Sequence, residues 1–235
     1  MRPAVTAFIG AALAAAGVAF GLGAGGLANA VHHHPTASLC LLAATLAMQL
    51  FSLRLPGQGS ISVSAVGVVA GGILLGAGFA MALGVAAALV QWGKSRGLAH
   101  RAAFDSANLV LSAGAAALVF HSLGDLHSSG TVRLVAGITA ALVYLAVNAG
   151  LLSLAMSLSE GSSVGTVWQE RLHWARYHLL AVGPLAVLTA SAYATLGAVS
   201  VVAFAAPAVL LGRLMRDAVP PEAEPEARPV LAAAA

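Results

Sequence analysis

Charged side chains are scarce in this sequence of 235 residues, at 8% of the chain, while hydrophobic residues make up 60%. Soluble globular proteins carry about 25% charged residues. The isoelectric point near 9.6 does not indicate a nucleic-acid-binding protein, because it results from 11 basic and 8 acidic residues scattered between apolar runs. This composition, with a mean hydropathy of +0.92, predicts an integral membrane protein.

Cysteine and catalytic motifs are nearly absent. Cys40 is the single cysteine, which excludes an intrachain disulfide and any CxxC motif. The sequence contains no P-loop, no GxSxG nucleophile elbow and no zincin helix. We therefore expect neither enzymatic activity nor a cofactor.

Apolar runs fill most of the chain and predict an all-α fold, a polytopic membrane bundle of about eight spans. A hydrocarbon core of about 30 Å requires about 20 helical residues. The run Ile61–Trp92 is too long for one span, and Gly71, Gly72, Gly76 and Gly78 near its centre favour a tight reversal between two short helices. The expected spans are Ala4–Leu27, Ala37–Leu53, Ile61–Leu75, Phe79–Trp92, Phe104–Phe120, Leu134–Leu158, His178–Tyr193 and Val199–Leu214.

A polar elbow, Ser159–Ser163, follows the sixth expected span. The next segment is rich in Trp, Arg and Tyr, which are typical of the headgroup layer. It places Val164, Val167, Trp168 and Leu172 on one side at helical spacing. This pattern predicts one interfacial amphipathic helix.

The two ends of the chain carry different signals. Ala28-Asn29-Ala30, behind the basic Arg2, resembles a signal-peptidase site, but the long apolar run favours a retained helix. The Pro-, Glu- and Ala-rich C-terminal end predicts a disordered tail. We therefore divide the chain into a transmembrane domain, 1–216, and a disordered cytoplasmic tail, 217–235.

The basic residues predict the orientation. With eight spans and a cytoplasmic N-terminus, ten of the 11 basic residues fall on the inner side and only Arg133 falls on the outer side. Cytoplasmic loops of membrane proteins are enriched in Lys and Arg. The distribution predicts a multi-pass protein of a bacterial cytoplasmic membrane, with both termini in the cytoplasm.

Polar residues inside the expected spans are candidates for a ligand cavity. Asp105, Asn108 and Ser112 share one helical face, and Asn148 lies near the middle of the next span. Polar groups at membrane depth commonly mark a site, although hydrogen bonds between neighbouring helices explain them equally well.

Histidines gather in the loops that the topology places outside. His121 and His127, with Asp125 beside them, form a plausible ligand set for Zn²⁺, Ni²⁺ or Cu²⁺. Solvated loop histidines are the simpler interpretation, because no HxxxH or HExxH spacing is present.

Several short motifs, in order, resemble a family of bacterial multi-helix membrane sensor domains found N-terminal to HD-GYP phosphohydrolases, diguanylate cyclases and histidine kinases. The resemblance covers roughly residues 40 to 215 and rests on Arg54–Ser60 (RLPGQGS), Phe104–Asn108 (FDSAN), Val143–Asn148 (VYLAVN), Leu158–Gly161 (LSEG), Val167-Trp168 and Gly183–Leu185 (GPL). The family resemblance implies an input module that signals to a cytoplasmic enzyme. This chain departs from the family pattern because only the short tail follows Arg216.

Two other functions remain open. The Gly-rich short helices behind a PGxGS-like loop also look like the substrate-binding subunit of a vitamin-type transporter, which docks on an energising complex. A structural membrane protein without a ligand is the third possibility. The expected partners are thus the lipid bilayer, a small molecule and a cytoplasmic signalling enzyme or energising complex, and not nucleic acid.

Overall fold

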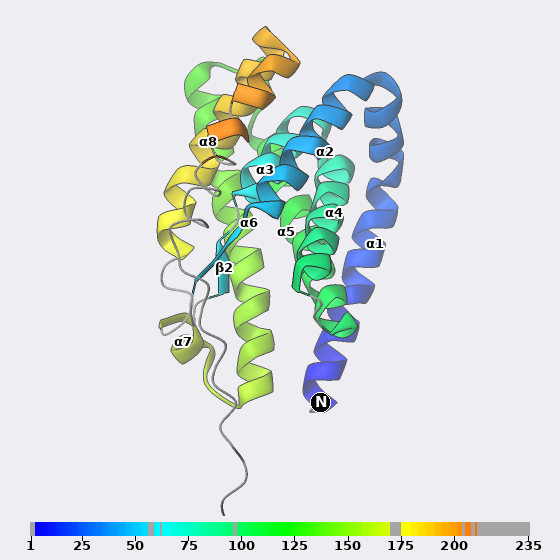
Figure 1. Cartoon of the computed structure of the whole chain (residues 1–235), viewed down its shortest axis with the longest axis vertical. Coiled ribbons are helices and arrows are strands. Elements are labelled where there is room, and N and C mark those ends of the chain that lie inside the picture. Colours follow the sequence, from blue (N-terminus) through cyan, green and yellow to red (C-terminus); the bar gives the residue numbers. More distant parts are fainter. Residues whose placement is uncertain are drawn as a thin grey trace, which may run out of the picture.

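The computed structural model describes residues 3–55, 59–61, 63–95, 98–169, 175–203, 205–207 and 210. These residues form a helical bundle (Figure 1). Its helices are α1 (Pro3–His33), α2 (Pro35–Leu50), α3 (Ser64–Leu75), α4 (Ala77–Ser95), α5 (Ala99–Leu123), α6 (Gly130–Glu160), α7 (Val164–Val167) and α8 (Ala175–Leu196). A further apolar helical stretch covers Ala198–Pro207.

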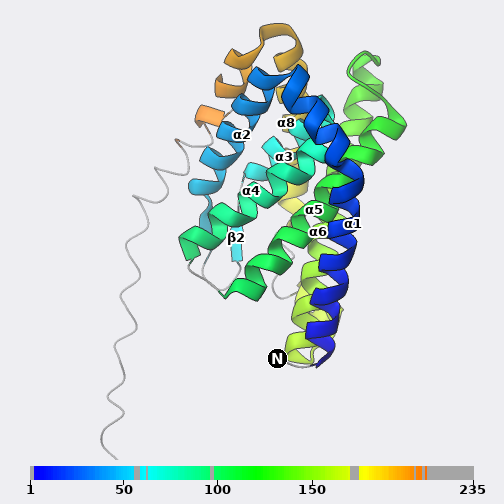
Figure 2. The same cartoon turned by 90° about the vertical axis from the view of Figure 1, so that its right-hand side faces the viewer.

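Helix α5 is the centre of the bundle and packs against α1, α3, α4 and α6. Helices α1 and α6 are the longest and run the height of the bundle, as Figures 1 and 2 show. Small residues let the helices approach closely. At the contact of α1 with α4, a β-carbon on Gly78 would overlap the carbonyl oxygen of Gly23.

A short β-hairpin interrupts the helices between α2 and α3. Strands β1 (Leu53–Leu55) and β2 (Gly59–Ile61) pair antiparallel, with Arg54 opposite Ser60. The expectation of an all-α fold is therefore correct for the bundle but missed this hairpin. Three-residue strands are too short to produce a recognisable alternating pattern in the sequence.

The predicted break in the Ile61–Trp92 run is confirmed. Gly76 alone separates α3 from α4, with φ of 86° and ψ of 177°, a conformation that only glycine adopts without strain. Its N–H donates to the carbonyl of Gly72, and its own carbonyl accepts from the N–H of Ala80. Gly76 thus ends one helix and begins the next.

The number of spans requires a correction. Four helices, α1, α4, α5 and α6, are long and apolar enough to cross a membrane, whereas the sequence predicted about eight spans. Helices α2 and α3 have 16 and 12 residues, and the hairpin includes Leu53 and Ile61, which the sequence pattern assigned to their spans. The apolar stretches Val182–Leu196 and Ala198–Pro207 are also short.

The interfacial segment is described only in part. Ser163 is the N-cap of helix α7, and its side chain accepts a hydrogen bond from the N–H of Thr166. Val167 is buried, whereas Val164 and Trp168 are exposed, so these side chains do not share one environment. Leu172, the end of the last expected span and the tail 217–235 lie outside the described residues.

Candidate functional site

The structure brings part of the predicted polar set together at the contact of α5 with α6. Asn108 and Ser112 are buried. The Asn108 side-chain amide donates to the backbone carbonyl of Asn148 at 3.3 Å, and the Ser112 hydroxyl donates to the backbone carbonyl of Asn108 at 2.7 Å. The first bond joins α5 to α6, and the second stays within one turn of α5. The ligand cavity predicted at these residues remains a prediction.

The other two members of the set contribute differently. Asn148 supplies its backbone carbonyl to the contact, and its side chain is only half-buried. Asp105 is half-buried one turn before Asn108, and the charge of Arg101, one turn earlier on the same helix, acts on its carboxylate.

The outer histidines are not gathered into a metal site in the part of the chain that the structure describes, where no three His, Cys, Asp or Glu side chains come together. His121 Nε2 lies 2.9 Å from the carbonyl oxygen of Gly72 on α3. Asp125 accepts hydrogen bonds from the N–H groups of His127 and Ser128 and from the Ser128 hydroxyl. The carboxylate therefore organises its own loop.

Those hydrogen bonds hold the pKa of Asp125 below its ordinary value, the Ser128 hydroxyl contributing most. Each donor stabilises the ionised carboxylate and none stabilises the protonated form. The geometry is that of an Asx turn, in which a short carboxylate side chain caps the backbone that follows it.

A second polar cluster, which the sequence analysis missed, joins α2, α3 and α4 beside the hairpin. We call it the inner polar cluster; it consists of Gln49, Ser52, Ser64, Gln91 and Lys94. Gln49 Nε2 donates to Gln91 Oε1 at 2.9 Å, and Ser64 Oγ donates to Gln49 Oε1 at 2.6 Å. Gln49 and Ser64 are buried, and Lys94 is exposed.

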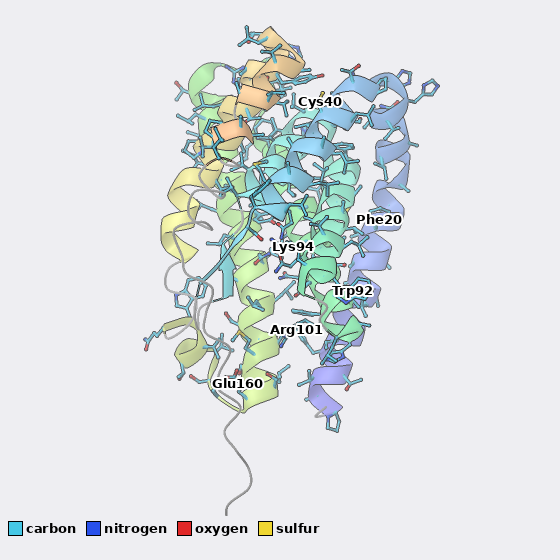
Figure 3. All side chains as sticks on the ribbon, in the orientation of Figure 1. Phe20, Cys40, Trp92, Lys94, Arg101 and Glu160 are labelled. Atoms are coloured by element: carbon cyan, nitrogen blue, oxygen red, sulfur yellow. The ribbon has the colours of Figure 1, made fainter. Side chains whose placement is uncertain are left out.

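Lys94 closes the end of α2. Its ammonium donates to the carbonyls of Gln49 and Leu50, at 3.2 and 2.8 Å, and to Ser52 Oγ at 2.9 Å. The last carbonyls of a helix have no partner within the helix and carry a partial negative charge. A cation from α4 therefore stabilises the C-terminus of a neighbouring helix, so the end of α4 fixes the end of α2. In Figure 3, Lys94 lies between Cys40 near the upper end and Glu160 near the lower end.

The cluster forms one connected series of hydrogen bonds. Ser52 Oγ accepts from Lys94 and donates to Gln91 Oε1, at 3.4 Å. Gln91 Oε1 also accepts from Gln49 Nε2, and Gln49 Oε1 accepts from Ser64.

An unpaired hydroxyl lies one helical turn away from this cluster. Thr45 Oγ1 is buried and has no hydrogen-bond partner. A β-carbon on Gly67 of α3 would overlap it. The hydroxyl therefore lies against the backbone of Gly67, where only a glycine leaves room for it.

One signal in the sequence could have pointed to the inner polar cluster. Gln49 and Gln91 are uncharged amides near the ends of two apolar runs, the ends that the charge distribution places on the cytoplasmic side. Their pairing spans 42 residues and depends on how α2 packs against α4, which single-helix periodicity does not reveal.

Comparisons with protein-family models, characterised proteins and solved structures find no match for this chain. The geometry is thus the only guide to function. Across the described residues the two polar groupings consist of amides, hydroxyls, one lysine and the carboxylate of Asp105, and the hydrogen bonds that they form tie helices together.

Proposed function

We propose that this chain is a multi-pass membrane protein of the sensor type, which passes a membrane or small-molecule signal to a cytoplasmic partner. The four long apolar helices support membrane insertion. When the chain is threaded as eight spans, with the short apolar helices included, ten of its 11 basic residues fall on the inner side, which supports a bacterial cytoplasmic membrane with both termini inside. The exposed Trp92 and Trp168 are suited to the inner interface, where tryptophan is enriched.

The inner polar cluster is the observation that carries this proposal. It ties the end of α2, the start of α3 and the end of α4 to each other by side-chain hydrogen bonds. The β-hairpin is the direct connection between α2 and α3. Any change in how these helices pack therefore moves both ends of the hairpin, which in the proposed topology faces the cytoplasm.

A cross-linking experiment tests the proposal. A photo-reactive amino acid replaces Ser60 in the hairpin, and a matched control replaces Ser122, which is exposed near the end of α5. We expect cross-links to another protein in cells from position 60 and not from position 122. The cross-linked protein should be a cyclase, a phosphohydrolase or a kinase. Absence of adducts from position 60 would count against a partner at the hairpin.

One observation favours the substrate-binding subunit of a small-solute transporter as the second candidate. Helices α3 and α4 are broken at Gly76, and transporters use broken helices with free ends to bind solutes. Adducts with a pair of ATPase subunits in the same experiment, together with a solute retained after gentle detergent extraction, would favour this function over sensing.

A further inference from the structure

Helix α3 is held by polar side chains of other helices at both of its ends. At its start, Ser64 Oγ donates to Gln49 of the inner polar cluster. Near its end, the carbonyl of Gly72 faces His121 Nε2 of α5 at 2.9 Å. Between these points α3 is short, 12 residues or about 18 Å, and therefore stiff.

The His121 contact coincides with the break between α3 and α4. The Gly72 carbonyl accepts both from His121 and from the N–H of Gly76, at 3.1 Å. Because a carbonyl oxygen only accepts, Nε2 carries the proton. The carbonyl that ends α3 is thereby joined to α5 as well as to the glycine that lets the chain reverse.

The imidazole is well placed to hold that carbonyl. Its ring stands edge-on to Phe120, with ring centroids 5.3 Å apart, and Phe120 is completely buried. One turn earlier on α5, Ala117 lies directly beside Gly72. His121 itself is exposed, so the contact can be reached from the outer surface of the proposed topology.

We propose that α3 acts as a rod between the His121 contact and the inner polar cluster, with His121 as the positioning residue that fixes its outer end at Gly76. Release of His121 from Gly72 frees the Gly76 break, shifts α3 and weakens the bond of Ser64 to the inner polar cluster. The inference rests on the proposed sensor function and identifies α3 as the element that moves when the signal is passed on.

Hydrogen exchange of the purified full chain in nanodiscs tests the rod. The variants are His121→Leu, which removes the donor, His121→Gln, which keeps an N–H donor, and His127→Leu as the control in the neighbouring loop. We expect His121→Leu to raise exchange of the Gly76 amide at least tenfold and that of the first turn of α3 at least threefold. His121→Gln should stay within threefold of the parent, and His127→Leu should equal it.

The reverse direction provides a second arm, because coupling between two sites is reciprocal. Lys94→Met, which disturbs the inner polar cluster, should raise exchange of the Gly76 amide at least threefold. Unchanged exchange at Gly76 in His121→Leu would overturn the role of His121. A change confined to the mutated end in both variants would overturn the rod. Neither result depends on the cross-linking outcome. Failure of the rod can therefore be distinguished from failure of the proposed sensor function.

Discussion

Lys94 Nζ at the end of α4 lies 2.8 Å from the carbonyl oxygen of Leu50, the last residue of α2. Lys94, which caps the C-terminus of α2, therefore belongs to another helix and lies 44 positions after Leu50 in the chain. Because the ammonium donates to two carbonyls and to Ser52, α4 stabilises the end of α2 in addition to the backbone bonds that α2 makes itself.

Replacement of Lys94 by methionine should destabilise the bundle by about 1–2 kcal/mol, because hydrogen bonds to charged groups contribute about 1.5–3 kcal/mol and this one is partly exposed. Lys94→Arg keeps a cation and its donors, and should cost less than half as much. Unfolding in mixed micelles measures both. Equal losses in the two variants would contradict the capping role.

A double-mutant cycle on Gln49 and Gln91 tests the buried amide pair. Gln49→Leu removes the hydrogen bonds that the Gln49 side chain makes with Gln91 Oε1 and with the Ser64 hydroxyl. This loss should destabilise the bundle by about 1–3 kcal/mol. The double leucine variant should cost less than the sum of the single ones, with a coupling energy of about 0.5–3 kcal/mol. Strict additivity would indicate that the two amides do not interact.

The contact between Asn108 and Asn148 is asymmetric, and mutation should reveal this. Asn108→Leu removes the donor and should cost about 0.6–2 kcal/mol, the range for hydrogen bonds between membrane helices. Asn148→Leu keeps the backbone carbonyl that accepts the bond and should change stability by less than about 0.5 kcal/mol. A larger loss for Asn148→Leu would show that its side chain helps to hold the helices together, whereas the predicted cavity requires near-normal stability with loss of ligand binding or signalling.

The Asp125 loop should respond to acid. The folded-state pKa of Asp125 lies below the ordinary value of 3.8, so the stabilisation is complete above that value and is lost as the pH falls through the folded-state pKa. The amide proton shift of Ser128, followed by NMR, should titrate with a midpoint below 3.8. In Asp125→Asn the shift should be flat; a parent midpoint at or above 3.8 would contradict the hydrogen-bonded loop.

Single-cysteine labelling tests the orientation. In a Cys40→Ala background, cysteine at Thr131, just after the Asp125 loop, should react with an impermeant maleimide in intact cells. Cysteine at Ser95, at the end of α4, should react only after permeabilisation. Reaction of position 95 in intact cells would overturn the orientation that the basic residues predict.

The features that could be predicted from the sequence are those a single segment determines. Apolar runs predicted the positions of α1, α5 and α6, and the glycines predicted the break at Gly76, because local sterics select glycine there. Helical spacing also predicted that Asn108 and Ser112 share one face, and both residues are buried.

The features that could not be predicted depend on tertiary packing. The partner of His121 is a backbone carbonyl, and every residue carries one, so no sequence pattern distinguishes Gly72. The hairpin between α2 and α3 was also missed, since its register depends on two three-residue strands that pair across the turn.

The shortness of α2 and α3 has a consequence for biosynthesis. A segment leaves the translocon for lipid when its apolar length is sufficient, and α3 has only 12 residues where about 20 are needed. In the proposed topology, α2 and α3 enter the bilayer as a group that waits for α4. Gln49 and Gln91 are 42 residues apart, so at about 5–20 residues per second the ribosome takes roughly 2–8 s to deliver the second amide. In that topology Gln49 therefore enters the membrane seconds before the amide that satisfies it is synthesised.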